Sequence, residues 1–172
     1  MNQKIKQLFA VGIGILALIG LDQWTKKLAV AGLMGKEPYI IWDGVFELRY
    51  LENRGAAFGM LQGKQGFFFV IAIVVLAASF FFFLRLPYSK KYLPLGMCVT
   101  GIVAGAVGNM IDRISQRYVV DFLYFSLIDF PIFNIADCYV TIGAVCLALL
   151  IMFYYKDEDF NVFSLKKGGK QD

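Results

Sequence analysis

The chain has 172 residues, a net charge of +4 and no histidine. Its hydrophobic fraction of 59% exceeds the roughly 45–50% of ordinary soluble domains, which excludes that class and predicts an integral membrane protein. The absence of histidine excludes Ser-His triads, Cys-His pairs and histidine-ligated zinc, so proton chemistry would fall to carboxylates. The basic residues are dispersed along the chain, which gives no indication of nucleic-acid binding.

Four apolar stretches predict four transmembrane helices, because about 20 residues are needed to cross a hydrocarbon core of roughly 30 Å. Within a single integral membrane domain over 1–172, the expected helices cover about 8–27, 67–85, 92–112 and 135–155. Small-residue repeats, Gly101-x-x-x-Gly105 and Ala104-x-x-x-Gly108, predict that another helix packs closely against the third.

One sizeable segment between the first two expected helices, about 37–60, is rich in β-branched and aromatic residues. Its Asp43-Gly44 pair is typical of a hairpin turn. The runs 119–125 and 128–133 are candidates to extend this β-structure. The predicted fold is therefore an all-α membrane protein of four transmembrane helices with a small β-rich cap on its outer face.

The loop between the second and third expected helices carries Arg85, Lys90 and Lys91. The two sides of the membrane hold nearly equal numbers of basic residues overall, but this short loop concentrates three of them. Because basic residues favour the cytoplasmic side, we expect a multi-pass protein with both termini in the cytoplasm. The chain after Tyr155 is expected to be a solvated, lipid-adjacent tail.

Five polar clusters fall at one end of the expected helices, on the side opposite the termini. They are Asp22-Gln23-Trp24-Thr25-Lys26, Asn53-Arg54-Gly55-Ala56-Ala57-Phe58-Gly59, Gly108-Asn109-Met110-Ile111-Asp112-Arg113, Val119-Val120-Asp121-Phe122 and Phe133-Asn134-Ile135-Ala136-Asp137. Carboxylates near hydrocarbon cost a few kcal/mol or more each, so they mark functional sites. The clustering predicts one site near the outer face.

Local sequence separates the roles of several acids. Asp22 has Lys26 four residues later on the same helical face, which predicts an ion pair with a structural role. Asp112 precedes Arg113, whose guanidinium could reach a substrate carbonyl or fix a loop; both interpretations stay open. Asp129 precedes a Phe-Pro pair, which favours a turn.

Asp121 and Asp137 have no basic residue within three positions, and both lie among apolar residues. Two such carboxylates brought close together cannot both ionise, so the pair would share a proton at neutral pH. A pair of this kind can activate water as a general base and protonate a leaving amine as a general acid. The alternative, that each acid only hydrogen-bonds backbone at a helix start, stays open here.

Taken together, the motifs resemble lipoprotein signal peptidase (signal peptidase II), a family of bacterial membrane aspartic endopeptidases. The resemblance rests on Asp22-x-x-Thr-Lys26, Asn53-x-Gly55-x-Ala57-Phe58-Gly59, Gly108-Asn109-x-x-Asp112-Arg113, Val-Val-Asp121-Phe and Phe-Asn134-x-Ala136-Asp137. Each motif alone is weak, but all five in order, across nearly the whole chain, form a specific pattern.

This resemblance implies that Asp121 and Asp137 are the catalytic dyad. It implies substrate-binding or supporting roles for Asp22, Lys26, Asn53, Gly55, Asn109, Asp112, Arg113 and Asn134. The implied substrate is a prolipoprotein whose signal peptide is cut just before a diacylglyceryl-modified cysteine. We expect location in the bacterial cytoplasmic membrane, no metal or organic cofactor, a monomer, and membrane lipid and the lipidated precursor as partners.

Two other function classes are weighed against this interpretation. A proton-coupled transporter also uses intramembrane acids, but it needs polar residues through the membrane depth. Beyond their outer ends, the second and fourth expected helices offer only Ser79 and Thr141. A non-enzymatic assembly protein would tolerate the loss of Asp121 or Asp137, which a peptidase would not.

Overall fold

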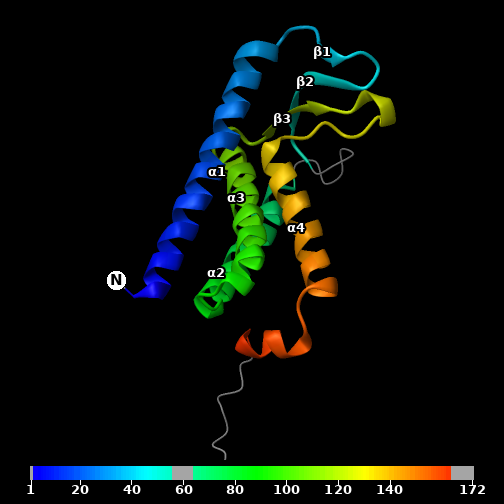
Figure 1. Cartoon of the computed structure of the whole chain (residues 1–172). Helices are drawn as coiled ribbons and strands as arrows, with labels where there is room; N and C mark the ends of the chain where they lie inside the picture. The colour runs from blue at the N-terminus through cyan, green and yellow to red at the C-terminus, as the bar shows by residue number, and fades with distance from the viewer. Residues whose placement is uncertain (1, 56–63, 164–172) are drawn as a thin grey trace, which may run out of the picture.

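The computed structural model describes residues 2–55 and 64–163. Long helices stand side by side, and a small sheet covers one end of them (Figure 1). The long helices are α1 (Gln3–Leu33), α2 (Gln65–Arg85), α3 (Leu93–Gln116) and α4 (Ile135–Phe153); the strands are β1 (Tyr39–Trp42), β2 (Phe46–Asn53) and β3 (Val119–Tyr124). Short 3-10 helices are η2 (Lys90–Tyr92), η3 (Ser126–Ile128) and η4 (Asp157–Phe163).

Within the described residues, these four long helices are apolar and long enough to cross a membrane, so the chain is a multi-pass membrane protein. Large apolar side chains on the outer surfaces of α1, α2 and α4 remain exposed in the isolated chain, including Leu16, Phe80 and Phe153. Such a surface suits contact with lipid tails. Helix α3 is the most buried and packs against the other three.

Small residues allow this close packing around α3. A Cβ atom added at Gly105 would overlap the backbone carbonyl oxygen of Ala136 in α4, and one at Gly108 would lie 2.5 Å from Oδ2 of Asp22 in α1. At Gly101 the same addition would make an ordinary contact, 3.5 Å from the nearest atom. The predicted close approach of another helix is confirmed, and it is tightest beside the polar end of α3.

Helix α1 begins earlier and ends later than the apolar stretch of 8–27 suggested. Its 31 residues span about 46 Å at 1.5 Å per residue, more than a hydrocarbon core of roughly 30 Å. The extra length supports the sheet, because Ala29 of α1 packs in one buried cluster with Val120 and Phe122 of β3.

The three strands form an antiparallel sheet in the order β1-β2-β3. The β1-β2 hairpin turns at Asp43-Gly44 as predicted, with Gly44 at a φ of +66°. Strand β3 arises from the predicted run 119–125. The run 128–133 does not form a further strand: its contribution is a single bridge between Phe133 and Leu123, because η3 and a turn at Asp129 redirect the chain.

The expectation of a solvated tail after Tyr155 is wrong for its first part. Residues 157–163 form η4, which lies against the ends of the helices away from the sheet (Figure 1). The Tyr92 hydroxyl donates to the Asp159 carbonyl oxygen at 2.9 Å, and the Phe163 ring stacks on Phe82 with centroids 5.2 Å apart. Apolar residues at 160 and 163 hold this segment down; residues 164–172 lie outside the described chain.

Candidate active site

The predicted site residues lie together where the helices meet the sheet. Hydrogen bonds and ion pairs connect Asp22, Lys26, Asn53, Gly55, Asn109, Asp112, Arg113, Asp121, Asn134 and Asp137 into one network. These residues come from α1, β2, α3, β3 and α4 and from the segment after β2. Three positions of the second motif, Ala57, Phe58 and Gly59, lie outside the described residues.

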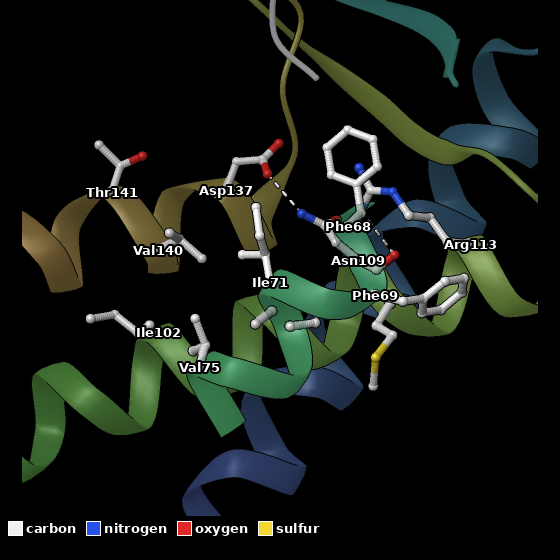
Figure 2. Close-up of a pocket in the computed structure, with 13 residues that line it drawn as sticks. Phe68, Phe69, Ile71, Val75, Ile102, Asn109, Arg113, Asp137, Val140 and Thr141 are labelled. Carbon is white, nitrogen blue, oxygen red and sulfur yellow. Dashed lines mark hydrogen bonds between the residues drawn. The ribbon is translucent and has the colours of Figure 1, made fainter. Parts of the chain in front are cut away.

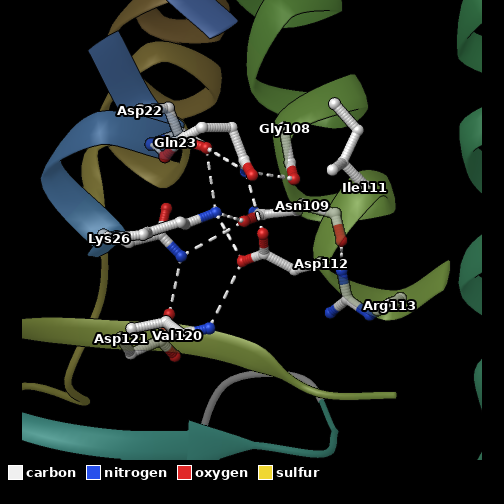
Figure 3. A network of polar contacts seen from close by, with 12 residues as sticks. Asp22, Gln23, Lys26, Gly108, Asn109, Ile111, Asp112, Arg113, Val120 and Asp121 are labelled. Atoms are coloured by element: carbon white, nitrogen blue, oxygen red, sulfur yellow. Dashed lines mark hydrogen bonds and ion pairs between the residues drawn. The ribbon is translucent and has the colours of Figure 1, made fainter. Parts of the chain in front are cut away.

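Lys26 is buried at the centre of the first part of this network (Figure 3). Its Nζ lies 3.0 Å from Oδ2 of Asp22 and 2.9 Å from Oδ2 of Asp112, and the exposed fractions of the three side chains are at most 5%. The predicted pair of Asp22 with Lys26 is confirmed. The ion pair across to Asp112 joins α1 to α3, and each carboxylate here has a partner, as burial of charge requires.

Asp22 also contacts the start of α4. Its Oδ1 accepts a hydrogen bond from the Ala136 backbone N–H at 3.0 Å, so a side chain of α1 satisfies one of the free N–H groups at this helix N-terminus. Sequence reasoning missed Gln23, which donates through Nε2 to Asp112 Oδ1 at 2.8 Å and to the Gly108 carbonyl at 3.2 Å. The signal for Gln23 was its place between Asp22 and Lys26 in the first motif.

Asp121 is buried on β3 and is held by two neutral amides. Its Oδ2 accepts from Nδ2 of Asn53 at 2.8 Å, and its Oδ1 accepts from Nδ2 of Asn134 at 2.6 Å. The register of β2 against β3 brings Asn53 diagonally opposite Asp121 on the same face. Burial, and then the charge of Asp137, raises the pKa of Asp121 to about 7.

Asp137 belongs to a capping box at the start of α4. The Asn134 side chain accepts from the Asp137 N–H at 3.0 Å, and Oδ2 of Asp137 accepts from the Asn134 N–H at 3.1 Å. The backbone-bonding interpretation of this acid is therefore correct for one oxygen. Its Oδ1 accepts instead from Nδ2 of Asn109 at 2.8 Å.

Two cavities meet at Asp137. One, of about 430 Å³, is lined by both Asp121 and Asp137 and by the 130–133 segment. The other, of about 320 Å³, is largely apolar and lies between α2, α3 and α4 (Figure 2). Asn109, Arg113 and Asp137 border both cavities, so a long ligand could pass from one to the other beside the carboxyl groups.

Arg113 fixes the segment that follows β2. Its guanidinium donates to the Gly55 carbonyl oxygen at 3.3 Å, and its carbon Cζ lies 4.4 Å from the centre of the Phe68 ring. Of the two interpretations of Arg113, this contact supports the one in which it fixes a loop. Because Arg113 also borders both cavities, contact with a bound ligand stays open.

The chemistry available at this site is acid–base chemistry. A buried acid with a pKa near neutrality and a second carboxyl group border one cavity. Within residues 2–55 and 64–163, the side-chain partners of these two carboxyl groups are neutral amides, and neither group forms an ion pair. Such a pair can remove a proton from water and supply one to a leaving group.

Comparison with known proteins places this chain among membrane peptidases. A lipoprotein signal peptidase from Streptococcus thermophilus (strain CNRZ 1066) is 41% identical over 150 residues, covering 87% of this chain and 95% of the relative. Another, from Caldanaerobacter subterraneus subsp. tengcongensis, is 43% identical over 137 residues, covering 79% of this chain and 91% of the relative.

The fold comparison agrees. A solved structure of a bacterial membrane enzyme is 31% identical and aligns over 93% of this chain and 94% of its own, with a TM-score of 0.74. The family model for signal peptidase (SPase) II matches residues 14–153, a range that includes every residue of the polar network described above. The chain therefore belongs to the signal peptidase II family of membrane aspartic peptidases.

Proposed function

We propose that this peptidase removes signal peptides from diacylglyceryl-modified bacterial prolipoproteins, cutting immediately before the lipidated cysteine with water activated by Asp121 and Asp137. The relatives' name supports the substrate class. The observation that carries the mechanism is the placement of both acids on one cavity, where Asp121 is 1% exposed and its pKa is about 7.

In this mechanism the two acids share one proton at neutral pH. The ionised carboxylate takes a proton from water, and the resulting hydroxide attacks the scissile carbonyl carbon. The protonated carboxyl group then gives its proton to the leaving amine, and the pair is restored after the products depart. Asn109 and Asn134 hold the carboxyl groups in place through hydrogen bonds, and this positioning reduces the entropy lost in reaching the transition state.

The two cavities suit a substrate that has both a hydrocarbon part and a peptide part. The apolar cavity between α2, α3 and α4 could take hydrocarbon, while Arg113 and Asn53 could contact the peptide backbone near the bond that is cut. A lipidated cysteine keeps that bond at the membrane surface, where the site would have to lie. Precursor without the diacylglyceryl group should therefore be cut poorly, and equal cleavage of both forms would contradict this recognition.

The mechanism is tested by cleavage of a purified lipidated precursor. Asp121→Asn and Asp137→Asn should each abolish turnover, and the double variant should be little worse than either single one, because the residues act as a unit. Asn at 137 keeps an oxygen for the capping box, so folding should survive.

Asp22→Asn, by contrast, should mainly lower stability. If Asp121→Asn stayed active while Asp112→Asn lost activity, the pairing would be wrong and Asp112 would be the second acid.

We further propose that both termini face the cytoplasm and that the sheet and the site face outward. Arg85, Lys90 and Lys91 lie at the end of the helices away from the sheet, the same end as the N-terminus (Figure 1). Impermeant thiol labelling of intact cells should modify a cysteine at Lys36, beyond α1, but not one at Ser89. The reverse labelling pattern would overturn this orientation.

A further inference from the structure

The side-chain amide of Asn109 has two different ends, and its surroundings require one orientation. Its Oδ1 accepts from Nζ of Lys26 at 2.9 Å (Figure 3) and from Nδ2 of Asn134 at 3.2 Å. Its Nδ2 donates to Oδ1 of Asp137 at 2.8 Å (Figure 2). Rotated by half a turn, the amide would place N–H groups against an ammonium group, which can only donate, and an oxygen against a carboxylate.

Lys26 itself has no freedom to move. An ammonium group has three N–H donors, and those of Lys26 have three partners: Asp22 Oδ2, Asp112 Oδ2 and Asn109 Oδ1, all within 3.0 Å. The side chain is 4% exposed. Two carboxylates, one on its own helix and one on α3, therefore hold the cation at a fixed point beside the amide.

The fixed orientation of the Asn109 amide also determines how the Asn134 amide is oriented beside Asp121. Nδ2 of Asn134 donates both to Oδ1 of Asn109 and to Oδ1 of Asp121, while its own oxygen accepts from the Asp137 backbone. The amides of Asn109 and Asn134 thus present N–H groups to the two acids. Both orientations follow from Lys26, the one cation that is buried among the residues the structure describes.

We propose that Lys26 is a positioning residue of the peptidase, which locks the Asn109 amide so that Asp137 and, through Asn134, Asp121 always face N–H donors. This inference rests on the proposed roles of the two acids. Lys26 borders neither cavity, so it acts through Asn109 and does not contact the substrate.

Electrostatics supports the same role. The charged groups that face Asp121 are Asp137 on α4, Lys26 on α1 and Arg113 on α3. The positive charge of Lys26 lowers the pKa of Asp121 and so opposes the effects of burial and of Asp137. Loss of Lys26 should therefore raise the pH at which activity declines on the alkaline side.

The test uses Lys26→Met combined with Asp22→Asn, which removes one positive and one negative charge together and leaves the network's net charge unchanged. On lipidated precursor, kcat should fall about a hundredfold, the cost of a misplaced catalytic group. KM should change little, and the alkaline limb of the pH profile should move upward. Thr100→Val is the matched control, because the Thr100 hydroxyl donates to the Gly96 carbonyl oxygen at 2.8 Å within α3 and lies outside the polar network, so kcat should stay near that of the wild type.

If the combined Lys26→Met and Asp22→Asn variant does not fold, a second variant tests the positioning role of Lys26. Asn109→Asp keeps an oxygen for Lys26 and Asn134 but has no N–H for Asp137, so kcat should again fall with little change in KM. A folded variant of either kind with wild-type kcat overturns the positioning role. The proposed function is judged separately: it fails if wild type does not cut the precursor or if Asp137→Asn is fully active.

Discussion

Asp121→Asn should make the protein more stable as it makes it inactive, and the gain should depend on pH. In the native state the pKa of Asp121 is about 7, against an ordinary value of 3.8, chiefly because of burial. Asparagine has nearly the same shape and never ionises. It therefore removes the cost of a buried charge and keeps an oxygen that can accept from Asn53 or Asn134.

The direction of this pH dependence follows from which state, native or unfolded, binds the proton of Asp121. Between pH 3.8 and about 7 the native protein retains a proton that the unfolded chain has released, so stability falls as pH rises through this window. The contribution of the group is complete below pH 3.8 and is lost above about 7. At 1.36 kcal/mol for each pH unit, the difference is on the order of 4 kcal/mol.

Thermal unfolding in detergent at a series of pH values measures this difference. At pH 8 the variant should melt on the order of 10 °C above wild type, and the two should converge near pH 4. Asp129→Asn makes the same chemical change at an exposed turn and should stay close to wild type throughout. A difference that is equal at pH 4 and pH 8, or a variant less stable than wild type at pH 8, would refute the reasoning.

Two further predictions test the site and its packing. Asn53→Leu removes an N–H donor that stabilises ionised Asp121. Since a hydrogen bond to a charged group contributes about 1.5–3 kcal/mol, the alkaline limb of the kcat/KM profile should move up by about one to two pH units. An unmoved limb would count against this role of Asn53. Gly105→Ala places a methyl group against the Ala136 carbonyl and should cost at least about 1–3 kcal/mol, whereas Gly12→Ala, with open space around it, should gain up to about 1 kcal/mol; similar melting temperatures for the two variants would show that the helices do not pack this closely.

The sequence alone determined the features that depend on local composition and spacing. Apolar stretches of sufficient length predicted the four spans, because hydrocarbon leaves a chain few alternatives to helix. The pairing of Asp22 with Lys26 was predictable, since residues four apart share a helical face. The Asp43-Gly44 turn followed from the need for a positive φ, which glycine adopts without steric cost.

Tertiary structure decided which individual groups contact one another across separate elements. Lys26 meets Asp112 because small residues let α1 and α3 approach, and no spacing within either helix encodes that contact. The docking of η4 and the failure of 128–133 to form a strand also depend on partners distant in sequence. The orientation of the Asn109 amide also depends on contacts between separate elements. Its oxygen faces the Lys26 ammonium group from α1, and its N–H group faces the Asp137 carboxylate from α4.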